Sequence, residues 1–243
     1  MNSYIDKIYD NEQFIPSKLG VFLNPYYLIR EGISREVISN SECLKGRLLD
    51  FGCGKKPYKK LIHVDEYVGV DICKSGDCLE SEYVDVYYDG KTIPFEDSYF
   101  DSIFSSEVFE HIFNLEEIIT ELHRVLKTNG YILVTMPFVW DEHEIPYDFA
   151  RYTSFGIKYL LEKQGFKIIK HTKTGNYVEV MFQMLAAYVN QSILPVKVRK
   201  FLSPFFVAPI IILGILLAKL LPINNNLFLN NVVLAQKLAP VQN

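Results

Sequence analysis

Glycines and acidic residues with the spacing of a ligand-binding turn follow two apolar stretches of the sequence. The segment LLDFGCG, residues 48–54, places Asp50, Gly52 and Gly54 at the end of the first stretch. The first glycine permits a tight turn, and the second lets a ligand approach the backbone. Asp71 ends the next stretch, EYVGVDI, where a carboxylate can accept hydrogen bonds from both hydroxyls of a ribose. The spacing therefore predicts a site for a nucleoside-containing ligand.

The turn differs from the patterns that bind phosphate groups. A dinucleotide-binding turn has a third glycine or alanine where this chain has Pro57. The lysines that follow Gly54 do not complete a G-x-x-x-x-G-K-[ST] loop. A ligand with a nucleoside end and a zwitterionic amino-acid end is favoured instead. Asp89, placed before Gly90 at the tip of a third strand, is positioned to accept a hydrogen bond from an adenine amino group.

Strands and helices are predicted to alternate around these turns. Strands are expected over RLLDF, EYVGVDI, YVDVYYDG, FDSIFSS, GYILVTMPF, FKIIKHTKTG and, near the end of the chain, LFLNNVVLAQK. Helices are expected over PYKKLIH, LEEIITELHRVLKT and SFGIKYLLEKQG, the second ending at Asn129-Gly130. This alternation predicts a parallel sheet with right-handed crossovers.

Composition narrows the function and the compartment. A net charge of −4 argues against a general nucleic-acid-binding protein. The four cysteines form no CxxC pair and have no zinc-binding spacing. The first residues, MNSYIDKIYDNEQF, lack the apolar core of a secretion signal. We therefore expect reduced thiols and a cytoplasmic location.

The ordered motifs resemble those of the class I S-adenosylmethionine-dependent methyltransferases, in the type 11-like subgroup with an E-H pair after the fourth strand. The motifs are LLDFGCG, YVGVDI, DGKTIPFEDSYFDSIFSSEVFEHI and ELHRVLKTNGYILVTMPF. The resemblance implies a Rossmann-like α/β fold, with a seven-stranded sheet, helices on both faces and an antiparallel last strand. It also implies S-adenosylmethionine as cofactor. By position, Asp50, Gly52 and Gly54 would line its methionine side, Asp71 its ribose and Asp89 its adenine, while Ser105, Ser106 and Glu107 would border the sulfonium.

A histidine beyond the fifth predicted strand is the candidate catalytic base. Methyl transfer to a hydroxyl needs a nucleophile held in line with the methyl group and a base near neutral pH. His143 lies in WDEHEIPYDFARYT, on the side where a substrate would enter. This stretch is similar to the H-x-x-P-x-D-x-x-R-Y-T segment of methyltransferases associated with bacterial surface polysaccharides. The alternative is that Asp148, Arg151 and Tyr152 only hold the loop in place.

The E-x-x-E-H pattern of Glu107, Glu110 and His111 is open to two interpretations. One is a divalent ion, by resemblance to some quinone-biosynthetic relatives. The other is a structural role, which is favoured because the same letters recur in members where no metal is implied. The sequence-based prediction is therefore a site without a metal.

Residues 176–222 interrupt the alternating pattern with an apolar insertion. Between Phe205 and Leu221 the only charged residue is Lys219. Because a predicted strand of the same sheet lies on each side, the insertion cannot cross a bilayer once. We predict a shallow re-entrant hairpin on the inner face of the cell membrane, whose anionic lipids suit the basic residues Lys197, Arg199 and Lys200. A lid or a dimer interface is the alternative.

Together these features predict four segments and one main function. The segments are an N-terminal helical cap (1–46), a methyltransferase core (47–175), an apolar helical hairpin (176–222) and a final strand with a tail (223–243). The predicted function is O-methylation of a small-molecule, glycan or lipid-linked acceptor. A nicotinamide-dinucleotide-dependent oxidoreductase and a non-catalytic membrane-docked protein are the alternatives.

Overall fold

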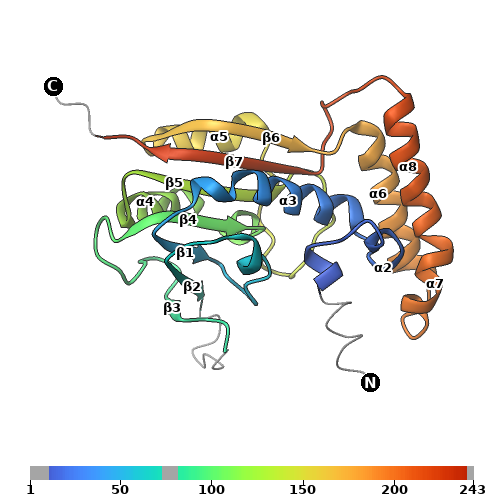
Figure 1. Cartoon of the computed structure of the whole chain (residues 1–243), viewed down its shortest axis with the longest axis horizontal. Helices are drawn as coiled ribbons and strands as arrows, with labels where there is room; N and C mark the ends of the chain where they lie inside the picture. The colour runs from blue at the N-terminus through green and yellow to red at the C-terminus, as the bar shows by residue number, and fades with distance from the viewer. Residues whose placement is uncertain (1–10, 73–81, 240–243) are drawn as a thin grey trace. The chain divides into compact units, whose positions relative to one another are not determined.

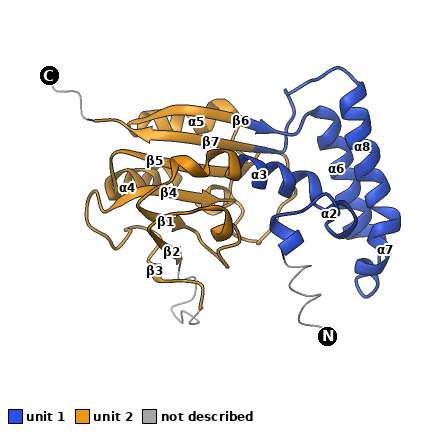
Figure 2. Cartoon of the chain, in the orientation of Figure 1, with its two compact units in different colours: residues 1–36, 173–230 blue, residues 37–172, 231–243 orange. Residues whose placement is uncertain are grey.

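A computed structural model describes residues 11–72 and 82–239 of the chain. These residues belong to two compact units, which Figure 2 shows in different colours. One unit comprises residues 1–36 and 173–230, and the other comprises residues 37–172 and 231–243. Cys43 and Cys53 are free thiols, whereas Cys73 and Cys78 lie outside the described residues.

A seven-stranded sheet of order β3-β2-β1-β4-β5-β7-β6 runs through the described residues (Figure 1). The pairs β1–β2, β1–β4, β2–β3 and β4–β5 are parallel, and β7 points opposite to β6, so the sheet is mixed. The order reverses between β1 and β4, which is where ligands bind in sheets of this kind. The predicted Rossmann-like class I fold is confirmed. The strands are β1 Arg47–Phe51, β2 Glu66–Ile72, β3 Val86–Tyr88, β4 Phe100–Ser106, β5 Leu126–Pro137, β6 Phe166–Thr174 and β7 Asn230–Lys237.

Two helices of the sheet-containing unit, α4 (Leu115–Val125) and α5 (Ser154–Lys163), pack their apolar faces into its core. The buried residues of α4 recur every three or four positions, as expected for a helix with one face on a sheet. They are Leu115, Ile118, Ile119, Leu122 and Val125. On α5, Ile157 and Leu161 do the same, and the Thr153 side chain caps its first turn by accepting from the Gly156 N–H at 3.1 Å.

The other unit is helical. It contains α2 (Gly20–Leu23), the start of α3 (Tyr27–Asn40), and a hairpin of α6 (Tyr177–Tyr188) with α7 (Arg199–Phe206) and α8 (Ala208–Leu220). A π-helical turn, Val189–Ile193, extends α6. The helices α6 and α8 approach closely at Gly214, where an added Cβ would lie 2.5 Å from the Cβ of Phe182. The predicted apolar hairpin is therefore a pair of packed helices.

Two predicted helices differ in the structure. The segment PYKKLIH contains only a 3₁₀ turn, Lys59–Leu61, because the chain must enter β2 at Glu66 and has no room for further turns. The helix α4 ends at Val125 instead of Asn129-Gly130, since Leu126 already pairs with Phe100 at the start of β5. Asn129, with φ +65°, lies inside β5 at a shift in its register with β4.

Candidate active site

A cavity of about 370 Å³ lies at the carboxyl ends of β1, β2 and β4. Gly52 and Gly54 line it from the turn after β1, and Asp71 lines it from β2. Glu107 and His111 follow β4 and line it from the other side. The switch point of the sheet therefore brings four of the predicted cofactor-binding residues, Gly52, Gly54, Asp71 and Glu107, to one cavity.

The glycine turn is shaped for close approach to its backbone. Gly52 has φ +71°, and a Cβ added to it would lie 2.4 Å from Cγ2 of Val108, which also lines the cavity. The N–H of Gly54 donates to Oδ2 of Asp71 at 2.9 Å, while Oδ1 of Asp71 accepts from the N–H of Ile72 at 2.8 Å. The carboxylate of Asp71 is thus fixed by two backbone donors at the edge of the cavity.

Two of the predicted cofactor-binding acids lie elsewhere. Asp50 is buried below the turn and accepts a hydrogen bond from the Tyr67 hydroxyl at 2.7 Å, and its burial raises its pKa to about 7. The carboxylate of Asp89 accepts from the backbone N–H groups of Lys91 and Thr92, both at 2.8 Å, and so closes a local turn. Neither acid is among the described residues that line the cavity.

At the end of β4, a chain of hydroxyl groups holds Glu107. Ser106 and Thr135 share a hydrogen bond of 2.8 Å between their hydroxyls, and Thr135 donates to Oε1 of Glu107 at 2.8 Å. Glu107 has φ +57°, a conformation that few non-glycine residues adopt. The hydroxyl of Ser105 is buried without a hydrogen-bond partner among the described residues. Of the three predicted sulfonium neighbours, only Glu107 lines the cavity described here.

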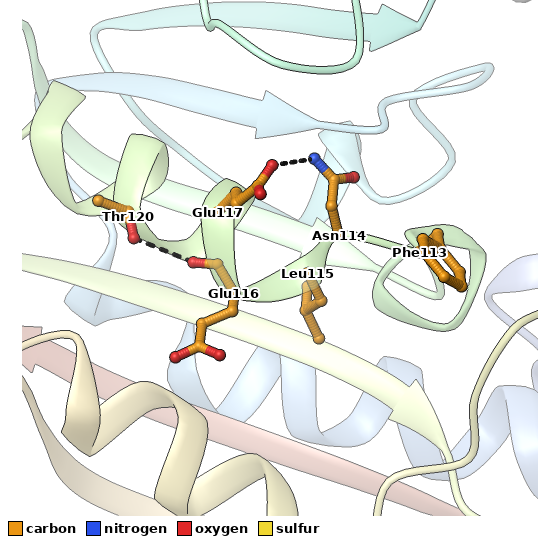
Figure 3. A pocket seen from close by; sticks show the side chains of 6 residues that line it. All are labelled: Phe113, Asn114, Leu115, Glu116, Glu117 and Thr120. Atoms are coloured by element: carbon orange, nitrogen blue, oxygen red, sulfur yellow. Dashed lines mark hydrogen bonds between the residues drawn. The ribbon is translucent and has the colours of Figure 1, made fainter.

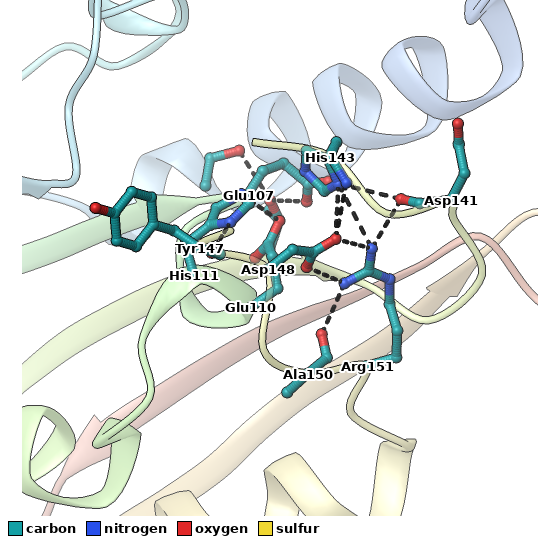
Figure 4. Close-up of polar contacts among 11 residues, drawn as sticks. Glu107, Glu110, His111, Asp141, His143, Tyr147, Asp148, Ala150 and Arg151 are labelled. Atoms are coloured by element: carbon teal, nitrogen blue, oxygen red, sulfur yellow. Dashed lines mark hydrogen bonds and ion pairs between the residues drawn. The ribbon is translucent and has the colours of Figure 1, made fainter. Parts of the chain in front are cut away.

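Two histidines meet beside Glu107 (Figure 4). The rings of His111 and His143 are in edge contact, with centroids 4.7 Å apart and planes at 78°. Nδ1 of His111 lies 2.8 Å from the carbonyl oxygen of Tyr147, which also lines the cavity. Burial lowers the pKa of His111, so its imidazole is neutral at pH 7. His143 lies in contact with this wall but is not itself among the described lining residues.

The loop that carries His143 is fixed by an ion pair. Arg151 donates to both oxygens of Asp148 at 2.6 and 2.7 Å, and it lowers the pKa of Asp148 to about 2. The backbone N–H of His143 also donates to Asp148, at 3.0 Å, and its Nδ1 lies 3.3 Å from the same carboxylate. Asp148 and Arg151 therefore hold the loop in place, as one of the sequence-based interpretations expected.

Glu110 lies buried under the two histidines. Its side chain is inaccessible to solvent, and neither carboxylate oxygen has a hydrogen-bond partner among the described residues. Its Oε1 lies 3.8 Å from Nε2 of His111. Burial and the neighbouring charge of Glu107 raise the pKa of Glu110 well above its usual range.

Several cavity residues were missed because their contributions depend on tertiary contacts. Val108 lies directly before a short turn, Phe109–His111, while Glu144 and Tyr147 come from the loop after β5. Both segments, EVFEH and WDEHEIPYDFARYT, stand out in the sequence, but nothing in them indicates that they meet. Backbone bonds join them, since the N–H groups of Phe149 and Ala150 both lie within hydrogen-bonding distance of the carbonyl oxygen of Glu110.

A second hollow lies at the N-terminal end of α4 and is drawn in Figure 3. Its polar side chains bond to one another or to the helix, as Asn114 does to Glu117 at 2.9 Å and Thr120 to the Glu116 carbonyl oxygen at 3.0 Å. These contacts brace the first turns of the helix. The hollow is lined by Phe113, Asn114, Leu115, Glu116, Glu117 and Thr120.

Comparison with known protein families gives a match over the core of the sheet. Residues 49–134 match a family model described as a methyltransferase domain. An uncharacterized protein of Methanocaldococcus jannaschii is 29% identical over 143 residues, which cover 54% of this chain and 69% of that protein.

Solved structures with the same fold extend the similarity over most of the chain. Phosphoethanolamine N-methyltransferase 2 of Haemonchus contortus, in complex with S-adenosyl-L-methionine, is 18% identical with a TM-score of 0.54, over 92% of this chain and 58% of that one. The YcgJ protein of Bacillus subtilis is 16% identical with a TM-score of 0.50, over 85% and 98%. The [4+2]-cyclase SpnF is 20% identical with a TM-score of 0.54, over 86% and 80%. At these identities the similarity establishes the fold.

Proposed function

We propose that the chain is a class I S-adenosylmethionine-dependent methyltransferase, and that its acceptor is an oxygen of a glycan or lipid-linked molecule at the cytoplasmic face of a membrane. The methyltransferase-domain match over residues 49–134 and the order of the sheet support the transfer of a methyl group. The methyltransferase-domain match decides against a nicotinamide-dependent oxidoreductase. The observation that carries the membrane part is an apolar stripe on the exposed face of α7 and α8.

The cavity fits the methyl donor in three respects. The turn is open at Gly54, which lines the cavity and has no described atom within 4 Å of the place of a Cβ, so that a ligand can lie against the backbone. Asp71 holds a carboxylate at the edge of the cavity, where it can accept hydrogen bonds from ribose hydroxyls. Ile72 and Tyr88 offer apolar surface for the adenine in place of Asp89. When bound, the donor supplies an electrophilic methyl group.

The acceptor hydroxyl must lose its proton, and the histidine pair is placed to assist this. His111 lines the cavity as a neutral imidazole, and His143, the predicted base, contacts it by its ring edge. We propose that the two act together to activate the acceptor. His143→Ala is expected to reduce turnover while donor affinity stays unchanged, whereas a wild-type rate at neutral pH would remove His143 from the mechanism.

The stripe consists of apolar side chains at the positions where a water-facing helix carries polar residues. Most of its members follow one another at intervals of three or four residues. The exception is the interval of eight residues from Phe205 to Leu213, and the exposed Pro209 lies at its midpoint. Each is between 49% and 79% exposed. The opposite face is apolar too, since Ile211 and Gly214 are buried. The stripe is formed by Phe201, Phe205, Leu213, Leu216 and Leu220.

Length and charge favour a lipid surface as the partner of the stripe. The consecutive helices α7 and α8, Arg199–Leu220, form the one helical segment of the described residues that is long and apolar enough to cross a membrane, with a mean hydropathy of 2.5 over 18 residues. Lys197 in the turn before it and Lys200 in its first turn are exposed, and they suit anionic headgroups at about 1 kcal/mol per lysine. Because these cations lie at the tip of the hairpin, tip-first insertion would bury them. We therefore propose that the hairpin lies flat in the interface, in place of the re-entrant arrangement.

Vesicle binding tests this proposal. We expect the full chain to float with phosphatidylglycerol vesicles more than with phosphatidylcholine vesicles. Leu213→Gln with Leu216→Gln removes two side chains that are about half exposed; at about 1 kcal/mol each, binding should fall roughly 30-fold. The matched control is Phe155→Gln on α5, where a more exposed apolar side chain lies outside the hairpin.

Other results would identify a different role. A full chain that stays in solution with both kinds of vesicle contradicts the membrane proposal. A dimer that the same double substitution dissociates, measured by analytical ultracentrifugation, would make the stripe a dimer interface. The acceptor class is tested by supplying the protein and methyl-labelled S-adenosylmethionine to a whole-cell lysate, whose lipids, glycans, proteins and nucleic acids are then separated. Label confined to proteins or nucleic acids would contradict it.

A further inference from the structure

We propose that Glu110, His111 and His143 bind a divalent transition-metal ion at the wall of the donor cavity. The inference rests on the proposed function only for the role of that ion, which is to activate the acceptor. The three residues each offer one ligand atom, and these atoms all lie within 4.8 Å of one another. Two ligands of one ion, at about 2.0–2.2 Å each, lie at most about 4.4 Å apart. A small side-chain rotation therefore closes the site.

The environment of Glu110 supports a bound cation, apart from the spacing of the three residues. It is fully buried, and among the site residues that the structure describes its carboxylate lacks the hydrogen bonds that its neighbours have. Glu107 accepts from Thr135, and Asp148 accepts from Arg151. A buried carboxylate without a hydrogen bond is costly unless a cation offsets its charge. Oε1 of Glu110 instead lies 3.8 Å from Nε2 of the His111 imidazole.

The charges around the cluster match a divalent ion. Besides Glu110, the carboxylates of Glu107 and Glu144 line the same cavity as His111. Arg151 and Asp148 form a bidentate pair and neutralise each other. A net negative charge then remains when Glu110 is ionised, and a divalent cation offsets it.

In both histidines one ring nitrogen has the kind of contact that orients a metal-binding histidine. Such a histidine binds the ion through one ring nitrogen while its other nitrogen contacts a backbone carbonyl or a carboxylate. Nδ1 of His111 lies 2.8 Å from the carbonyl oxygen of Tyr147. Nδ1 of His143 lies 3.2 Å from the carbonyl oxygen of Asp141 and 3.3 Å from Asp148. Both rings are therefore oriented before any ion binds.

The donor set selects the kind of ion. Two imidazoles and one carboxylate suit Zn²⁺, Fe²⁺ or Mn²⁺ better than Mg²⁺ or Ca²⁺, which prefer oxygen ligands. His111 borders the cavity, so open coordination positions would face the acceptor. A Lewis acid there lowers the pKa of a hydroxyl group that contacts it. The E-x-x-E-H pattern had favoured a site without a metal, because the same letters recur in methyltransferases where no metal is implied. The proposed ligand set differs from that pattern, since Glu107 is bonded to Thr135 and His143 comes from a separate loop.

Cobalt titration tests the site without donor or acceptor. We expect the chelator-treated full chain to bind one equivalent of Co²⁺ with visible absorption bands typical of nitrogen ligation. Glu110→Gln preserves shape, and His143→Gln removes one ligand; each should weaken binding by more than about 100-fold, because loss of a mere supporting contact already costs about 10–100-fold. The matched control, Glu142→Gln, changes an exposed acid of the same loop and should bind like the wild type.

The outcomes separate the metal from the reaction. Absence of saturable Co²⁺ binding, or binding that Glu110→Gln and His143→Gln leave unchanged, would overturn the metal site and leave methyl transfer untouched. Binding that both substitutions remove, in variants with wild-type circular dichroism, supports the site. A chain that binds Co²⁺ in this way but transfers no methyl group would overturn the proposed function alone.

Discussion

Replacing Gly52 by alanine tests whether the close packing of Val108 on the turn after β1 shapes the donor cavity. The substitution adds one methyl group at a residue with φ +71°. The new Cβ would lie 2.4 and 2.6 Å from the two Cγ atoms of Val108. These distances are too short for carbon atoms, so Val108 must move, and it lines the cavity.

The expected cost has two parts. A left-handed backbone conformation costs a non-glycine residue about 1–2 kcal/mol. Displacing a packed side chain such as Val108 adds about 1–3 kcal/mol. The free energy of unfolding of Gly52→Ala should therefore fall by about 2–5 kcal/mol. If the displaced Val108 projects into the cavity and costs donor binding the same 1–3 kcal/mol, donor affinity falls roughly 5- to 150-fold.

Urea denaturation and calorimetric titration with S-adenosylhomocysteine measure the two effects. Gly54→Ala is the matched control for stability, since Gly54 has φ +48° but no described atom lies within 4 Å of its added Cβ. The free energy of unfolding of Gly54→Ala should fall only by the cost of the left-handed backbone, about 1–2 kcal/mol. Adding Val108→Ala to Gly52→Ala should recover affinity by removing the clash. A Gly52→Ala protein as stable as Gly54→Ala, with wild-type affinity, would refute this packing argument.

The remaining predictions concern a ribose contact, a buried acid and a helix contact. Asp71→Asn should weaken S-adenosylhomocysteine binding roughly 10- to 150-fold in calorimetry, because a charged hydrogen bond is lost, while the melting temperature changes little since the amide still accepts from Gly54; unchanged affinity contradicts the ribose contact. Burial raises the pKa of Asp50 to about 7, so the folded state keeps a proton that the unfolded state releases near pH 4. The free energy of unfolding should therefore fall as the pH rises from about 4 to 7. Asp50→Asn should remove this slope in urea denaturation and gain up to about 4 kcal/mol at pH 8, whereas an unchanged slope rules Asp50 out as its source. Gly214→Val should destabilise the hairpin by about 1–3 kcal/mol by pushing against Phe182, and a hairpin that is as resistant to proteolysis as the wild type would contradict that packing.

The strands were predictable because their apolar runs are long and end in clear turns. The predicted EYVGVDI and FDSIFSS coincide with β2 and β4. Asn129-Gly130 misled the prediction, since the same pair that stops a helix also permits a shift of register inside a strand. Nothing local distinguishes the two, and pairing of Leu126 with Phe100 decides between them.

The site was predictable where a residue acts at the end of its own strand. Gly52, Gly54 and Asp71 reach the cavity in this way. Asp89 was predicted by the same rule but forms a turn with its own neighbours, a local alternative always available to aspartate. The place of His111 in the wall depends on a contact with the Tyr147 loop, 36 residues away, which no local pattern encodes.

The last strand to be synthesised occupies an interior place in the sheet. In the chain, β7 follows the hairpin, yet in space it lies between β5 and β6. On the ribosome, β5 and β6 emerge first and keep open edges until residues 230–237 are released. The apolar hairpin is complete by then. If it docks on a membrane as proposed, the nascent chain would bind the bilayer before its sheet closes, and a chain truncated at residue 229 would bind vesicles without transferring methyl groups.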